Sequence, residues 1–211
     1  MPSVSQNRRD RHRAETRQAI LDAARELFVE LGYEATTMRA VAKRVEYTPT
    51  ALYHYFRNKE ELLTEICVRD FGELAAAFLR IGRIEDPVER LGKIGEAYVE
   101  FALHYPMHYR LMFLTPRPEA VDDRIDHHDP SQDAYAFLRH TCAEAIATGR
   151  LREEFDDADE LAQISWSSLH GLMALHVVKG RASDIDWRDP RTTTAKMRQA
   201  LTHGWMRPEG K

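Results

Sequence analysis

Residues 48–59 carry small, hydroxyl and cationic side chains, with the types and spacing of a surface that binds a polyanion. The sequence Thr-Pro-Thr-Ala at 48–51 would allow close approach to the base edges of DNA. Tyr53 and His54, one helical turn further, carry groups that reach phosphates or bases. Lys59 adds its charge to the positive end of a following helix, which is a natural phosphate site. The predicted chemistry is binding rather than catalysis.

Two short helices and one long helix must position these side chains. Thr37 is a good N-cap for a helix over 38–44, and Thr48 is a good N-cap for a second short helix with Pro49 in its first position. A capping-box pattern that begins at Asn58 starts the long helix. Two short helices, separated by about three residues and followed directly by a long one, predict a helix-turn-helix.

The rest of the chain also shows helical patterns. Asp86-Pro87, Asp129-Pro130 and Asp189-Pro190 each place an N-cap acceptor before a proline, and each precedes a helical pattern. Gly149 and Gly180 stand at predicted C′ positions, where the backbone is left-handed. We find no Asn-Gly hairpin signal and no sustained alternation of polar and apolar residues. The sequence therefore predicts an all-α protein without strands.

The charge is unevenly distributed along the 211 residues, whose formal net charge is −4. Residues 1–60 hold 11 basic and 8 acidic side chains, which makes them +3 and leaves the remainder at −7. This asymmetry favours a polyanion partner for the N-terminal part alone, and the alternative is a solvated basic segment with no partner. The basic arm at 8–13 either threads a minor groove, adds attraction to phosphates or is a disordered tail.

Several classes of protein are excluded by composition. Only two cysteines, Cys67 and Cys142, are present, which excludes a disulfide-dense scaffold and fits a reducing cytoplasm. No apolar run approaches the roughly 18 residues of a spanning helix, and no secretory signal is expected, so no membrane partner is predicted. No Gly-rich phosphate loop, nucleophile elbow or kinase signature is present. We therefore expect neither an enzyme nor a cofactor.

The main alternative is a metal-responsive regulator. His104 and His108 share one helix face, His-His-Asp occupies 127–129, and His140 is close to Cys142 in the sequence. Helical histidine pairs at this spacing bind zinc in other proteins, but no His-Glu-x-x-His motif is present. A third possibility is a helical ligand-binding bundle that does not bind DNA.

The segment 14–65 contains five characteristic words: Ala-Ile-Leu at 19–21, Leu-Phe at 27–28, Gly-Tyr-Glu-Ala-Thr-Thr at 32–37, Val-Ala at 41–42 and Leu-Tyr-His-Tyr-Phe-Arg-Asn-Lys-Glu-Glu-Leu at 52–62. In the order and spacing of these words it resembles the TetR-type family, the tetracycline-repressor-like transcription regulators. This resemblance implies a homodimer on a palindromic double-stranded DNA operator, and a C-terminal domain that senses a small-molecule effector and controls repression. It implies a basic arm at 1–13, a helix-turn-helix domain at 14–62 and a ligand-binding and dimerisation domain at 63–211.

The resemblance also implies which residues contact DNA. Arg39 matches a position that commonly contacts a base or phosphate, and Thr37 combines N-capping with a phosphate hydrogen bond. Glu46 departs from the family, which usually has Gly in this turn; a left-handed non-Gly residue costs about 1–2 kcal/mol. The predicted DNA contacts are Thr37, Arg39, Thr48, Pro49, Thr50, Tyr53, His54 and Lys59.

The C-terminal part resembles the WHG type of this family in two phrases, at 101–113 and 166–172. A pocket with apolar and aromatic walls suits a hydrophobic or aromatic ligand, although each such residue on its own is equally typical of a packed core. Trp166, His170 and Gly171 in particular are interpreted as core packing. The predicted ligand contacts are Phe101, His104, Tyr105, His108, Met112, Tyr135, Trp166, His170 and Met173. The predicted dimer seam is Ser168, Gly171, Leu172, Leu175, Met197 and Leu201.

Overall fold

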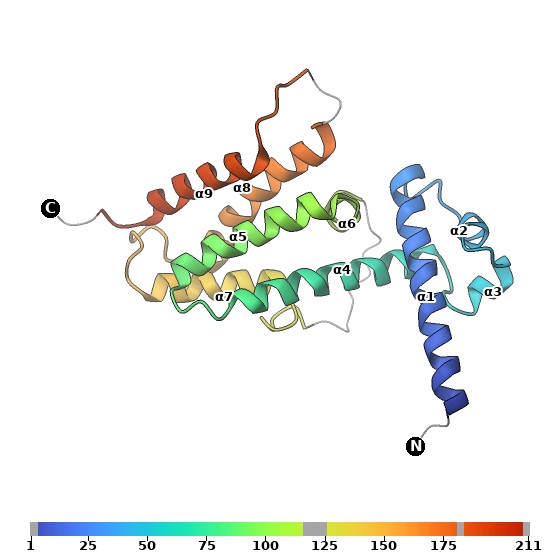
Figure 1. The fold of residues 1–211 in the computed structure, drawn as a ribbon. Coiled ribbons are helices and arrows are strands. Elements are labelled where there is room, and N and C mark those ends of the chain that lie inside the picture. The colour runs from blue at the N-terminus through green and yellow to red at the C-terminus, as the bar shows by residue number, and fades with distance from the viewer. Residues whose placement is uncertain (1–3, 116–125, 181–183, 209–211) are drawn as a thin grey trace. The chain divides into compact units, whose positions relative to one another are not determined.

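The computed structural model describes residues 4–115, 126–180 and 184–208 (Figure 1). These residues form helices joined by turns, with no strand beyond one isolated bridge between Leu151 and Met206, so the predicted all-α fold is confirmed. The elements are α1 Val4–Leu31, α2 Met38–Arg44, α3 Pro49–Tyr53, α4 Lys59–Ile81, α5 Pro87–His104, α6 Pro106–Tyr109, the π-helical segment η1 Arg110–Leu114, α7 Ala134–Ala147, α8 Ala158–Lys179 and α9 Pro190–Trp205.

Contacts divide the chain into two compact units. The first unit combines Met1–Asp70 with Met107–Asp122, and the second combines Phe71–Pro106 with Asp123–Lys211. The segment that contains α6 and η1 therefore groups mainly with the N-terminal helices, although α5 and α7 on either side of it belong to the second unit. The predicted domain limits at residues 13 and 62 stay predictions.

The first unit is built around one apolar face of α1. Ile20, Ala24 and Phe28 are buried at four-residue steps, which is the spacing of a single helix face. Leu52 and Phe56, at and just after α3, are also buried, in agreement with their predicted place in the core. Because the apolar residues of α2 and α3 face the core, the other side chains of these helices face outward.

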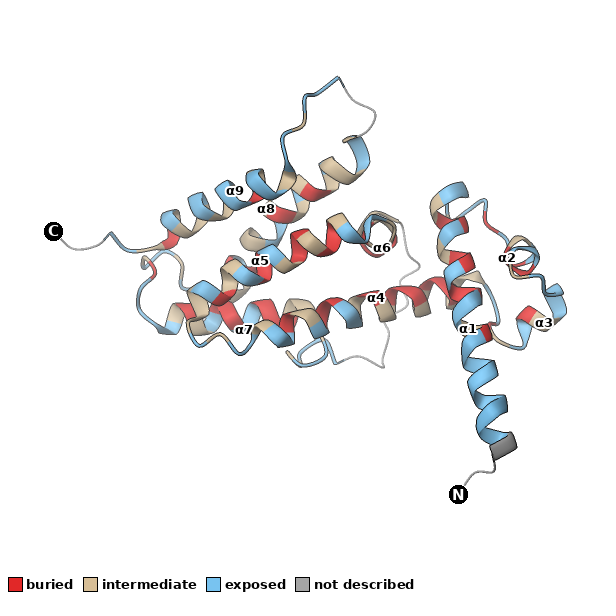
Figure 2. Ribbon diagram, viewed as in Figure 1, coloured by how far each residue is buried: buried red, intermediate tan, exposed pale blue. Residues whose placement is uncertain are grey.

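The helix α1 begins earlier than expected. Residues 6–15 are helical and exposed (Figure 2), so the interpretation of the basic arm as a disordered tail is wrong for these residues. They contain no Gly or Pro and are rich in Arg, which has a high helix propensity. Each residue added to an existing helix also avoids the cost of nucleation, so the packed turns from Thr16 onward support the extension.

The turn between α2 and α3 is a Schellman motif with an unusual residue. The Tyr47 N–H donates to the carbonyl of Ala42 at 2.9 Å, and the Glu46 N–H donates to that of Lys43 at 3.2 Å. Glu46 has φ +59°, so it adopts the left-handed conformation that glycine usually supplies. The turn geometry is thus retained despite the substitution, and the backbone of Glu46 is strained.

The second unit packs α5 against α7, α8 and α9. Gly95 permits this close approach, because a Cβ there would lie 2.6 Å from the Arg198 side chain and 3.0 Å from that of Leu169. Asp86 caps α5 by accepting from the Val88 N–H at 2.9 Å. The hydrogen bond from Arg150 lowers the pKa of Asp86 to about 2, so the cap stays ionised.

Two helix ends differ from the sequence-based expectations. Asp133, not Asp129, caps α7, because the Asp129 carboxylate accepts from the Ser131 N–H within a turn before the helix. Gly149 has φ +68° after α7 and confirms its C′ prediction, whereas Gly180 is a right-handed C-cap with φ −58°, so that prediction is wrong. Among the described helices none combines the length and apolar character needed to cross a membrane.

Glu46→Gly should stabilise the protein. Relief of the left-handed strain, partly offset by the greater freedom of glycine in the unfolded chain, predicts a gain of about 0.5–1 kcal/mol in the free energy of unfolding. The midpoint of urea denaturation measures this change. Gly32→Ala is the matched control, because Gly32 has φ +86° and no atom near its added Cβ, and it should lower the midpoint. A lower midpoint for Glu46→Gly would refute the proposed strain.

Candidate nucleic-acid interface

The surface of α2 and α3 presents most of the predicted DNA contacts to solvent. Seven of the eight predicted residues are exposed, and Lys59 is half-buried. The exposed seven are Thr37, Arg39, Thr48, Pro49, Thr50, Tyr53 and His54. Leu52, between the exposed residues of α3, is fully buried and anchors the helix. Short-range periodicity thus separates the outward side chains from the core.

Both short helices begin with the predicted threonine cap. Thr37 Oγ1 accepts from the Ala40 N–H at 3.1 Å, and Thr48 Oγ1 accepts from the Ala51 N–H at 3.2 Å. Pro49 follows Thr48 in the first helical position, where its missing N–H leaves no bond unmade. The caps fix where α2 and α3 start, and they therefore fix the direction of Arg39 and Tyr53.

The basic residues of this surface differ in their availability. Arg39 and Lys43 lie four residues apart on α2, are exposed, and have no ion-pair partner among the described residues. Arg44 is engaged, because its guanidinium donates to Glu26 and Glu30 of α1, both at 2.9 Å. The side chains of Arg39 and Lys43 are thus the cations of α2 that remain available to phosphates.

Lys59 holds the loop between α1 and α2. Its ammonium donates to the carbonyls of Tyr33 at 3.0 Å and Glu34 at 3.3 Å, and it lies 4.3 Å from the centroid of the Tyr33 ring. Burial, with help from Glu60, raises the pKa of Tyr33 to about 12. The structure therefore gives Lys59 an internal role, and its contact with phosphate stays a prediction.

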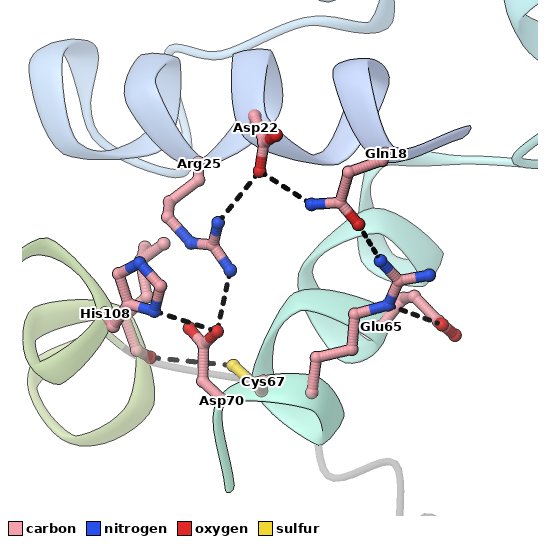
Figure 3. Close-up of polar contacts among 9 residues, drawn as sticks. Gln18, Asp22, Arg25, Glu65, Cys67, Asp70 and His108 are labelled. Carbon is pink, nitrogen blue, oxygen red and sulfur yellow. Dashed lines mark hydrogen bonds and ion pairs between the residues drawn. The ribbon is translucent and has the colours of Figure 1, made fainter. Parts of the chain in front are cut away.

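A buried carboxylate joins three segments of the first unit (Figure 3). Asp70, at 0% exposure, accepts from the Arg25 guanidinium of α1 at 2.6 Å, and the imidazole of His108 of α6 lies 3.0 Å from the same oxygen. The Arg25 guanidinium also donates to Asp22 at 3.1 Å. Sequence periodicity did not identify Asp70 or Arg25, and no motif marks them.

The Cys67 thiol reinforces this contact by donating to the carbonyl of Leu111 in η1 at 3.8 Å (Figure 3). Arg17 of α1 likewise donates to Glu65 of α4 at 2.9 Å. Polar contacts on both sides of Asp70 therefore hold α1 and the 107–114 segment to the first part of α4.

The second unit contains a hydrogen-bonded aromatic cluster at part of the predicted ligand region. Trp166 Nε1–H donates to the Tyr98 hydroxyl at 3.3 Å, and that hydroxyl lies 2.8 Å from His170 Nδ1. Burial lowers the pKa of His170, which favours the neutral ring as an acceptor. The Tyr135 ring lies 5.8 Å from that of Trp166. Tyr98, which joins two predicted ligand residues, was not predicted as a site residue.

The other predicted ligand contacts are dispersed. Phe101 and Tyr105 place their rings 5.6 Å apart, but Phe101 is buried and Tyr105 is 48% exposed. Met173 is fully buried in the second unit. His104 contacts Glu100 on its own helix, with Nδ1 2.9 Å from the Glu100 carbonyl oxygen. His108 and Met112 belong to the first unit, so the nine residues do not form one cluster within either unit.

The candidate metal ligands have separate partners. His127 Nδ1 lies 2.8 Å from Asp133, His140 lies 3.8 Å from Glu144, and His108 pairs with Asp70. Burial raises the pKa of Cys142 to about 12, which disfavours the thiolate that metals require. Within the described ranges, no three or more His, Cys, Asp or Glu side chains are grouped to hold a metal ion.

The predicted dimer seam lies on α8 and α9. Gly171 is exposed and nothing lies within 4 Å of its added Cβ, so it does not permit the close approach of a helix within this chain. Trp166 is 38% exposed, so the core interpretation is wrong for both residues. Leu175 and Val178, four and seven residues after Gly171, are 54% and 46% exposed on the same face.

Comparison with known proteins identifies the family. The model for "Bacterial regulatory proteins, tetR family" matches residues 20–66, and that for "Tetracyclin repressor-like, C-terminal domain" matches residues 91–200. The second match alone covers more than half of the chain. The protein therefore belongs to the tetR family of bacterial regulatory proteins. This membership confirms the prediction of a transcription regulator with a helix-turn-helix, and of a protein that is not an enzyme.

Individual curated relatives are similar to only part of the chain. The HTH-type transcriptional repressor Rv1474c of Mycobacterium tuberculosis is 36% identical over 84 residues, 40% of this chain and 43% of the relative. The HTH-type transcriptional regulator UidR of Escherichia coli is 41% identical over 63 residues, 30% of this chain and 32% of the relative. The alignments thus span less than half the length of these two relatives.

A solved structure supports the fold along the whole chain. The TetR family transcriptional regulator PfmR from Thermus thermophilus superposes with a TM-score of 0.69 at 22% identity, over 99% of this chain and 100% of that one. At this identity the likeness establishes the arrangement of helices alone.

Replacing Asp70 tests the buried carboxylate. Asp70→Ala would leave the Arg25 guanidinium buried without its main anion, and we expect a loss of about 3 kcal/mol in the free energy of unfolding. The urea midpoint measures this loss. Glu100→Ala is the matched control, because it removes an exposed carboxylate bound to Arg191 and should change the midpoint much less. Equal shifts for the two variants would contradict the structural role of Asp70.

Proposed function

We propose that this protein is a homodimeric, sequence-specific DNA-binding regulator that represses transcription, and that a small hydrophobic or aromatic ligand relieves its binding to a palindromic operator. The observation that carries the proposal is the α2–α3 surface, where capped helices present Arg39, Thr50 and Tyr53 to solvent. An exposed α3 anchored by the buried Leu52 suits insertion into a major groove. The repressor Rv1474c, 36% identical over 84 residues, supports the direction of regulation.

Homodimerisation is supported by the exposed apolar face of α8. Leu175 and Val178 would lose contact with water against a second copy, and the exposed Gly171 would let a helix of that copy come close. Leu172, Met197 and Leu201 are half-buried on α8 and α9 and would extend the seam. A twofold dimer also matches a palindromic operator, because each DNA-binding head would occupy one half-site.

The ligand proposal rests on the aromatic cluster around Tyr98. Trp166 and Tyr135 offer aromatic surface, while the Tyr98 hydroxyl and His170 provide polar groups beside it. A site of this composition suits an apolar or aromatic molecule with a few polar atoms. The phrase Trp-Ser-Ser-Leu-His-Gly-Leu at 166–172 supports a C-terminal domain of the WHG type.

A regulator that binds DNA would act in the cytoplasm.

We also propose how ligand binding is transmitted to the DNA-binding helices. Tyr105, at the C-terminal end of α5, is followed directly by α6, whose His108 contacts Asp70. A change at the end of α5 would therefore displace α6, which Asp70 links to Arg25 of α1. In this proposal the contact between His108 and Asp70 is either kept or broken, which would convert a small displacement into a discrete change.

Selection of fragments from the organism's own genome tests the proposed DNA binding. The full chain should retain a small set of fragments that share a palindrome with half-sites about one helical turn, roughly 34–36 Å, apart. Arg39→Ala should weaken binding to these fragments at least tenfold, which corresponds to about 1.4 kcal/mol. The reason is that it removes a cation that would face base edges or phosphates.

Arg188→Ala is the control, because it removes the same charge from an exposed Arg188–Asp186 pair in the second unit. Its affinity for the selected fragments should match that of the unaltered protein. Retention of no fragment, or equal losses for the two variants, would contradict the proposed DNA binding. Selection of single half-sites without symmetry would contradict the dimer.

A further inference from the structure

The helical N-terminal extension concentrates unpaired positive charge. Arg8, Arg9 and Arg13 are exposed and have no ion-pair partner among the described residues, whereas Arg11 lies 3.7 Å from Glu15. Elsewhere in the first unit most of the described cations are paired internally, as Arg44 is with Glu26 and Glu30. The extension therefore holds charge that the fold itself does not use.

Arg9 and Arg13 share the face of α1 that packs against the helix-turn-helix. The Thr16 hydroxyl lies 3.4 Å from that of Tyr47, at the turn before α3. At about 100° per residue, Arg9 and Arg13 point within about 60° of the direction of Thr16. Arg8 and Arg11 point about 80° and 140° away from it. The N-terminal extension thus continues the face of α1 that contacts the turn before α3. It places Arg9 and Arg13 on this face, beyond the packed part of the domain.

The position of Arg17 supports this placement. Its guanidinium lies 4.7 Å from the centroid of the Phe56 ring, just after α3, so the turn that contains Thr16 and Arg17 is held against the helix-turn-helix. With a rise of about 1.5 Å per residue, Arg13 and Arg9 lie about 5 and 11 Å beyond Thr16 along the axis. In Figure 1 the start of α1 projects past α3.

The helical form of the extension decides what part of DNA it can contact. An α-helix with its side chains is about 10–12 Å across, whereas the minor groove is about 6 Å wide, so the extension as a helix cannot thread that groove. Guanidinium groups along a helix face suit phosphates on the outside of the duplex, which they bind with two parallel hydrogen bonds. Arg9 and Arg13, about 6 Å apart along the axis, would bind phosphates of one backbone.

We infer that Arg9 and Arg13 form a second phosphate-binding surface, which grips the DNA backbone outside the groove that α3 occupies. This inference rests on the proposed DNA binding. The extension contributes affinity without reading sequence, because phosphate contacts position the protein but carry no base information. Two heads of a dimer would provide four such contacts.

The salt dependence of DNA binding tests this inference. The probes are a palindromic duplex recovered by the genomic selection and an unrelated duplex of equal length. For the dimer, Arg9→Gln/Arg13→Gln should lower the steepness of log K against log salt by about 3–4, because each lost phosphate contact contributes about 0.9. Affinity for both duplexes should fall by a similar factor.

Arg8→Gln/Arg11→Gln is the matched control, with the same loss of charge on the other faces of the same helix. Its slope should stay within about 1 of that of the unaltered protein. Equal slopes for the two double variants would overturn the inference. If the unaltered protein bound neither duplex, the proposed function itself would fail, so the two failures are distinguishable.

Ala14→Pro tests whether the helical form matters. Proline would start the helix at residue 14 and unwind the turns before it while keeping every charge. We expect a slope reduced towards that of Arg9→Gln/Arg13→Gln. A slope equal to that of the unaltered protein would show that a flexible basic tail is sufficient, and would overturn the inference. Circular dichroism confirms that the rest of each variant is folded.

Discussion

The buried carboxylate of Asp70 is the interaction on which the first unit depends. It accepts from Arg25 of α1 and contacts His108 of α6, so a single group on α4 holds segments that are 45 and 38 residues away in the sequence. A buried anion with two cationic or polar partners is stable only while both remain in place. The position of α1, and with it that of α2 and α3, therefore depends on the segment that follows α5.

The distribution of charge follows from the same arrangement. Arg25 and Arg44 of the first unit are engaged in ion pairs that stabilise it, whereas α2 and the exposed start of α1 carry cations without such partners. The net charge of the whole chain, −4, conceals this division. An acidic protein can therefore still present a cationic surface, because exposed cations without ion-pair partners are concentrated on α2 and on the start of α1.

Local signals predicted much of the fold. Thr37 and Thr48 mark the starts of α2 and α3 by cap chemistry, and Glu46 keeps the left-handed turn because the Schellman hydrogen bonds persist around it. Asp129 failed as a cap because Asp133 offered a competing N-cap four residues later. Local patterns do not reveal such competition, which depends on the turn that precedes the helix.

The candidate sites were predicted less completely. The exposure of the residues predicted to contact DNA follows from the period of short helices. The roles of Asp70, Arg25 and Tyr98 do not, because they come from contacts between residues 38 or more positions apart. A disordered tail was among the alternatives for residues 8–13 because chain ends are often disordered, although helix propensity and a packed continuation favour order. Periodicity along the sequence does not reveal such residues, because only the folded chain brings their partners together.

Hydrogen–deuterium exchange of the full chain, with and without the selected palindromic duplex, measures directly whether α2 and α3 contact DNA. We expect DNA to slow exchange of the amides of α2 and α3, residues 38–53, because these helices would lie against the duplex. Slower exchange confined to the second unit, with residues 38–53 unchanged, would contradict it.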